Sequence, residues 1–115
     1  MELKFDYAEV EKYFSDIELM KEKIGKNLAR GIKKRCDQLQ AASNFSDFLI
    51  TGLGKPHSLT GNLRGGYGIS VSGNIRLVVI PEAESLDPGC LKKCDTVIVK
   101  GVVDYHGQKH EWLIP

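Results

Sequence analysis

The chain has 115 residues, of which 42% are hydrophobic and 27% are charged, and a formal net charge of +1. This length suits a single domain over residues 1–115, and the composition excludes an intrinsically disordered chain. No apolar run approaches the roughly 20 residues of a membrane span, and the charged residues within Met1–Asp6 are unlike a signal peptide. We therefore expect a cytoplasmic protein with no membrane partner.

The first half of the chain has patterns of one strand followed by helices. Leu3 and Phe5 alternate with charged residues, which predicts a short half-buried strand. Ser15-Asp16-Ile17-Glu18 matches a capping box, so Ser15 is expected to cap a long helix. An apolar stripe with helical spacing should face the core of the protein. Its members are Ile24, Leu28, Ile32, Cys36 and Leu39.

The predicted helical region is basic and contains glycines. Residues 21–35 hold seven Lys or Arg side chains and one acid, Glu22. Such a surface can attract a polyanion or an acidic partner, or it can simply be a solvated helix face. Gly25 predicts a kink or a break. A further short helix is expected around Phe45, Phe48 and Leu49, ending before Gly52.

After Pro56 the pattern changes to the alternation of a sheet. Residues 67–71 and 75–80 predict two antiparallel strands joined by a tight turn at residues 72–74. Residues 82–95 are expected to form a long exposed loop, and the β-branched run 96–103 predicts a buried central strand. Helices first and strands second favour an α+β fold, with N-terminal helices packed on one face of a curved, mainly antiparallel sheet.

The sheet half also contains side chains suited to phosphodiester chemistry. Histidine can transfer protons near neutral pH, and arginine offers a permanent forked cation to a phosphate. Each candidate also has a structural interpretation: Arg76 could form an ion pair with Asp104, and His57 could be an ordinary loop residue. The candidates are His57, Arg64, Arg76 and the run Asp104-Tyr105-His106.

Two segments together resemble a known family. Residues 56–65 and 74–77 resemble the pattern of HigB-type toxins, His-x-Leu-Lys-Gly, a basic turn, a hairpin and Trp-Arg-Leu. Residues 102–106 resemble that family's closing Asp-Tyr-His. HigB-type toxins, also described as plasmid maintenance killer proteins, belong to the RelE/ParE superfamily of type II toxin–antitoxin systems. With the helical front half, the resemblance spans nearly the whole chain.

The resemblance implies a RelE-like microbial RNase topology and ribosome-dependent, metal-independent cleavage of mRNA, which would inhibit translation. It implies no cofactor and no bound metal, with the ribosome and mRNA as partners and a HigA-like, DNA-binding antitoxin as the neutralising protein. By similarity, His57 and His106 would transfer protons, Arg76 would clamp the phosphate, Tyr105 would stack or orient, and Asp104 would orient. The expected RNA-binding residues are Lys55, Thr60 and Arg64.

The sequence departs from the family pattern at three places. Thr60 replaces a lysine, which removes one cation that would stabilise negative charge in the transition state. Ile75 replaces the tryptophan before the hairpin arginine. An additional tail, Gly107–Pro115, follows the Asp-Tyr-His and could either cover the site or add an edge strand.

Three other interpretations remain open at this point. A ParE-like toxin that poisons DNA gyrase would need no RNA-cleaving residues. A domain that has lost activity and only binds its antitoxin is compatible with Thr60. A zinc-binding interaction module would use Cys90, Cys94, His106 and His110, whose spacing nearly matches a Cys2His2 site, although the intervening β-branched run is unlike a zinc finger.

Overall fold

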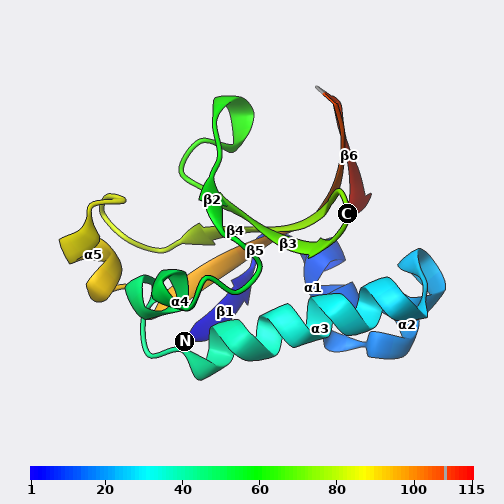
Figure 1. Cartoon of the computed structure of the whole chain (residues 1–115). Coiled ribbons are helices and arrows are strands. Elements are labelled where there is room, and N and C mark those ends of the chain that lie inside the picture. The colour runs from blue at the N-terminus through cyan, green and yellow to red at the C-terminus, as the bar shows by residue number, and fades with distance from the viewer. Residues whose placement is uncertain (108) are drawn as a thin grey trace.

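A six-stranded sheet forms the centre of the protein, and the long helix α3 lies along one of its faces (Figure 1). The computed structural model describes residues 1–107 and 109–115. In chain order the elements are β1 (Glu2–Phe5), α1 (Ala8–Ser15), α2 (Ile17–Ile24), α3 (Lys26–Ala41), α4 (Phe45–Thr51), β2 (His57–Ser58), the 3-10 helix η1 (Gly61–Leu63), β3 (Tyr67–Ser72), β4 (Ile75–Pro81), α5 (Pro88–Lys92), β5 (Thr96–His106) and β6 (Lys109–Ile114). This is the α+β architecture that the sequence predicts.

Strand β5 is the central element of the sheet. One of its edges pairs antiparallel with β4, which continues to β3 and β2. Its other edge is shared, because β1 pairs in parallel with residues 96–99 and β6 pairs antiparallel with residues 102–106. The prediction of a buried central strand is confirmed. Its valines are fully buried, and three of them, Val97, Val99 and Val102, belong to the core cluster; the fourth is Val103.

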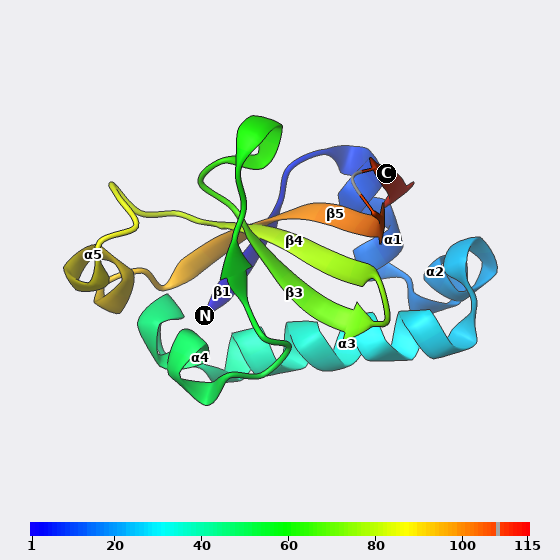
Figure 2. The ribbon, with the colours of Figure 1, turned by 45° about the horizontal axis from the view of Figure 1, so that its top comes forward.

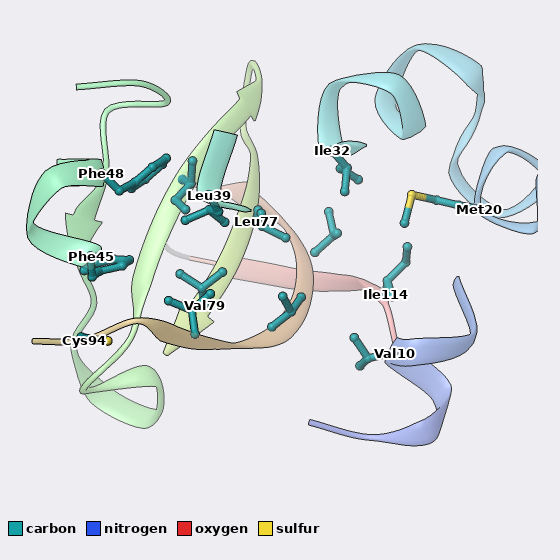
Figure 3. Packing of buried hydrophobic residues seen from close by; sticks show 14 of the residues in the cluster. Val10, Met20, Ile32, Leu39, Phe45, Phe48, Leu77, Val79, Cys94 and Ile114 are labelled. Carbon is teal, nitrogen blue, oxygen red and sulfur yellow. The ribbon is translucent and has the colours of Figure 1, made fainter. Parts of the chain in front are cut away.

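The core lies between the helices and one face of the sheet. Ala29, Ile32 and Leu39 of α3 are buried in the same cluster as Leu77 and Val79 of β4. Figure 3 shows two ends of this cluster, one with the phenylalanines of α4 and one where side chains of α1, α2 and β6 meet. The predicted apolar stripe of the long helix is therefore the surface that attaches the helices to the sheet.

The helical half differs from the sequence prediction in its boundaries. A helix over Ala8–Ser15 was not predicted, and the cap of the next helix is Asp16 rather than Ser15. The Asp16 carboxylate accepts hydrogen bonds from the backbone N–H groups of Glu18 and Leu19, at 3.1 and 3.2 Å. The predicted break at Gly25 is confirmed, because this residue has φ +92° and separates α2 from α3.

The cap assignment can be tested by substituting the two candidate residues. We expect Asp16→Ala to lower the free energy of unfolding by about 1 kcal/mol, because two amides at the start of α2 lose their acceptor. Ser15→Ala is the matched control and should change stability by less than about 0.5 kcal/mol. Urea unfolding followed by circular dichroism measures both values. A larger loss for Ser15→Ala would restore the capping box predicted from the sequence.

The predicted exposed loop over residues 82–95 is wrong in part. The segment contains the short helix α5, and its Leu91 and Cys94 are buried. The Cys94 carbonyl accepts a hydrogen bond of 2.8 Å from the N–H of Phe45, which ties the segment to α4. A proline is favourable at the start of a helix, and the buried leucine of α5 attaches the segment to the core. The polar composition of residues 82–95 therefore led to an overestimate of their exposure.

A β-bulge interrupts β5 where it passes between β4 and β6. Val78 pairs with Gly101 and Val79 with Val99, so Lys100 has no direct counterpart on β4. Gly101 has φ +144°, and a Cβ atom there would collide with the carbonyl oxygen of Ile114 in β6. The absence of a side chain thus lets β6 approach β5. Among the described residues, no helix is both long and apolar enough to span a membrane.

Candidate functional site

The face of the sheet opposite α3 is framed by two raised segments. Figures 1 and 2 show β2 with the η1 loop rising from the sheet on this side, and β6 rising at the other end of the sheet. Strand pairing places His57, Arg76, Tyr105 and His110 on this open face. Tyr105 pairs with His110, and Arg76 pairs with Val103, two positions from Tyr105. His57 pairs with Gly68, two positions from the β3 partner of Arg76. The open face is therefore where the candidate residues must be evaluated.

A hollow of about 500 Å³ lies on this face. It is lined by two histidines from opposite sides, His57 of β2 and His110 of β6, and by Tyr105 near the end of β5. The η1 segment closes it with Thr60 and Asn62. Strands β2 and β5 are three strand spacings apart, about 14 Å in a flat sheet. The curvature of the sheet and the η1 loop bring their side chains to one hollow.

His57 lies on the short edge strand β2 with its ring over Gly68. A Cβ atom at Gly68 would lie 3.4 Å from His57 Cε1 and 3.5 Å from Nε2, so a side chain there would crowd the imidazole. The Nδ1 atom lies 3.4 Å from the carbonyl oxygen of Lys55, which orients the ring. His57 is exposed, and a solvent-accessible imidazole can exchange protons with a bound substrate.

Tyr105 forms the floor of the hollow near β6. Its N–H donates to the carbonyl oxygen of Asn74 at 3.0 Å, which fixes the end of β5 against the β3–β4 turn. Its ring lies 5.8 Å from the His110 ring, with a 42° angle between the planes. Burial raises the pKa of the Tyr105 phenol, and the Arg76 guanidinium partly offsets this effect. The phenol is therefore protonated at neutral pH and can donate a hydrogen bond or a proton.

Arg76 lies beside Tyr105 on the open face, on the neighbouring strand. Its Nη1 atom donates to the carbonyl oxygens of Gly73 at 2.6 Å and Ile75 at 3.2 Å, and lies 3.4 Å from Ser70 Oγ. The expected ion pair with Asp104 is not among the interactions of the described residues. All of these contacts are on Nη1, so among the described interactions Nε and Nη2 carry no hydrogen bond. Their N–H groups are donors of the kind that a phosphate accepts.

Asp104 and His106 point the other way. Asp104 is paired with Ile75, whose side chain packs against the core on the helix side, and side chains alternate along β5. The two residues contact each other, with His106 Nε2 3.1 Å from an Asp104 carboxylate oxygen. The structure thus brings His57, Thr60 and Tyr105 into one hollow and Arg76 beside it, but it does not bring His106 there.

The remaining predicted RNA-binding residues are at the margin of the hollow. Lys55 and Arg64 are exposed and are not among its lining residues. Lys55 has φ +46° and supplies the carbonyl oxygen that orients His57. Arg64 follows η1, and its N–H donates to the Gly61 carbonyl oxygen at 3.1 Å. Of the three residues, Thr60 alone lines the hollow.

Among the titratable residues that line the hollow, His110 is the one that sequence reasoning did not assign to this site. The tail forms the edge strand β6, which was one of its two expected roles, and this strand carries His110 into the hollow. The signal was the alternation of His110 and Trp112 with the charged residues Lys109 and Glu111, a period-2 pattern typical of a strand.

The zinc-binding interpretation is wrong for its proposed ligand set. Cys90 and Cys94 precede β5, whereas His106 and His110 lie at and beyond its far end. Eleven strand residues span about 36 Å, far more than one zinc site allows. Over the residues that the structure describes, no three His, Cys, Asp or Glu side chains form a candidate metal cluster.

Comparison with known proteins shows the fold of the chain. No family model and no curated protein matches the sequence. Among solved structures, the chain is similar to a chain of the YoeB–YefM complex from Staphylococcus aureus, at 19% identity and a TM-score of 0.54, covering 92% of this chain and 97% of that chain. A structure described as the heterotetrameric YoeB–YefM toxin–antitoxin complex from the same organism gives the same values. The protein has the RelE-like α+β fold.

Proposed function

We propose that this protein is the toxin of a type II toxin–antitoxin system and cleaves mRNA on the ribosome. The observation that carries the proposal is the hollow on the open face, where two histidines and a protonated tyrosine converge beside an arginine. The RelE-like fold, similar to chains of toxin–antitoxin complexes, supports it. The segments that resemble HigB-type toxins favour that branch of the superfamily, with a HigA-like antitoxin as the partner.

The chemistry follows from the three tasks of RNA cleavage. A base removes the proton of the ribose 2′-hydroxyl, which attacks the adjacent phosphorus, and an acid protonates the leaving 5′-oxygen. A cation stabilises the extra negative charge of the pentavalent phosphate between these steps. We propose His57 and His110, on opposite sides of the hollow, as the proton-transfer pair, with Arg76 holding the phosphate and Tyr105 donating a hydrogen bond.

This assignment replaces His106 with His110, and a pair of variants decides between them. We expect His110→Ala to reduce mRNA cleavage by about 100-fold or more, because it removes an imidazole that lines the hollow. His106→Ala is the matched control, since His106 contacts Asp104 away from the hollow, and it should reduce cleavage by less than about fivefold. Purified protein, ribosomes and a defined mRNA, with 5′ ends mapped by primer extension, provide the rates. The reverse order of effects would restore the assignment based on the family resemblance.

The proposed function itself is tested by expressing the chain with and without the neighbouring reading frame. We expect growth arrest with new RNA 5′ ends inside translated codons, and relief of both when the neighbouring protein is present. Growth arrest with DNA breaks and no new RNA ends would instead indicate a ParE-like gyrase poison. Binding to the neighbouring protein without growth arrest would indicate a domain that has lost activity.

A further inference from the structure

A second hollow lies beside the first on the open face. It measures about 380 Å³ and is lined by Tyr7, Lys100, Trp112 and Pro115 together with residues shared with the first hollow. The shared residues are Asn62, Leu63 and His110. The two hollows are therefore neighbours along η1 and β6, so a chain molecule bound in one could extend into the other.

Two of the four residues that are particular to the second hollow are aromatic, Tyr7 and Trp112. Tyr7 is 58% exposed although it is a large side chain, and Trp112 is half-buried on β6. Trp112 is paired with Val103, two positions from the Tyr105–His110 pair, so it extends the same face of the sheet. Exposed aromatic faces that line a hollow are suited to stacking against planar rings, and nucleobases are the planar rings of an RNA chain.

The lysine of the second hollow is paired with a neighbouring aspartate. Lys100 Nζ lies 2.5 Å from an Asp6 carboxylate oxygen, with both side chains about a quarter exposed. The same ammonium group lies 5.6 Å from the centre of the Tyr7 ring. The bulge in β5 aims Lys100 toward this face. A paired lysine and aspartate attract a phosphate weakly but offer both a donor and an acceptor to the edge of a neutral base.

We propose that the second hollow binds the base of a nucleotide adjacent to the cleavage site, by stacking on Tyr7 and Trp112. This proposal rests on the proposed function, because it assumes that RNA occupies the first hollow. The arrangement divides the tasks between the two hollows. Arg76 beside the first hollow holds the phosphate, and the second holds a base with little dependence on charge.

The test uses the intrinsic fluorescence of Trp112, which is the single tryptophan of the chain. The probe is a 5′-labelled RNA hexanucleotide with 2′-O-methyl groups, which cannot be cleaved because the attacking hydroxyl is blocked. We expect saturable quenching of Trp112, and loss of quenching when one particular nucleotide is made abasic while label anisotropy still reports binding. Quenching that is unchanged by an abasic residue at any position would overturn the proposal, and so would binding without quenching.

Variants of Tyr7 provide a second readout that does not depend on tryptophan. Tyr7→Leu should weaken hexanucleotide binding about tenfold, as expected for loss of one stacked base, and Tyr7→Phe should retain binding. Folding is not expected to suffer, because the Tyr7 side chain makes no capping hydrogen bond to α1. Ile50→Ala, at an exposed apolar residue of α4, is the surface control. Equal affinities for Tyr7→Leu and Tyr7→Phe would contradict the stacking role.

These outcomes separate the subsite from the proposed function. If wild-type protein cleaves mRNA but Trp112 and Tyr7 do not respond to RNA, the subsite is wrong and the nuclease stands. If wild-type protein neither cleaves mRNA on ribosomes nor binds the hexanucleotide, the proposed function fails and the subsite fails with it.

Discussion

Gly101→Ala should destabilise the protein by about 4 kcal/mol or more, a large part of the 5–15 kcal/mol typical of a domain. The residue has φ +144°, a backbone conformation that side chains rarely adopt, and this strain alone costs about 1–3 kcal/mol. The new Cβ atom would also collide with the Ile114 carbonyl oxygen, so β6 would have to move away from β5. That movement would withdraw Ile114, which is fully buried, from the core.

Urea unfolding measures the loss, and Gly89→Ala is the matched control. Gly89 lies in α5 with a φ outside the positive region, and a Cβ atom there would meet open space. Alanine has a higher helix propensity, so this control should be neutral or stabilising by up to about 1 kcal/mol. Similar stabilities of the two variants would show that β6 does not depend on the close approach at Gly101.

Substitution of Arg76 should produce the largest effect on activity. We expect Arg76→Gln to lower mRNA cleavage by about 100- to 1000-fold, because the developing charge on the phosphate would lose its cation. Arg76→Lys should recover only part of the rate, since an ammonium group keeps the charge but cannot form two parallel hydrogen bonds. Primer extension on ribosome-bound mRNA gives the rates.

Two controls separate this catalytic effect from instability. Arg76→Gln also removes the bonds from Nη1 to the β3–β4 hairpin, so its free energy of unfolding should be measured and is expected to fall by about 1 kcal/mol. Arg64→Gln removes an exposed cation outside the hollow and should reduce cleavage by less than about fivefold. A greater loss of cleavage in Arg64→Gln would indicate that the phosphate binds nearer to η1 than we propose.

Much of the fold could be predicted from the sequence because its signals are local. The alternation of residues 67–71 and 75–80 and the β-branched run of 96–103 identify β3, β4 and β5. Gly25 marks the break between two helices for a similarly local reason. The first helix was missed although Val10, Tyr13 and Phe14 have helical spacing and pack on the core, because Ala8–Ser15 is only eight residues long and shows the pattern over a short stretch.

The site was harder to predict because it depends on pairing between distant segments. Adjacent residues of a strand face opposite sides, so Tyr105 and His106 cannot both face one hollow unless the strand end is irregular. Whether Tyr105 or His106 faces the open side depends on the register of β4 with β5 and on the bulge at Lys100. His110 reaches the hollow only through the pairing of β6 with β5.

The parallel pairing of β1 with β5 has a consequence for synthesis of the protein. Glu2 is made before α1 to α5, yet its partner Thr96 belongs to a strand made after these helices. Contacts between such distant residues must overcome a large loop-closure entropy, which slows folding. The two histidines are also far apart in the order of synthesis, because His57 is made well before His110. A partly synthesised chain that ends before β6 therefore lacks the assembled hollow. For an enzyme proposed to attack translating ribosomes, this order would protect the ribosome that is making it.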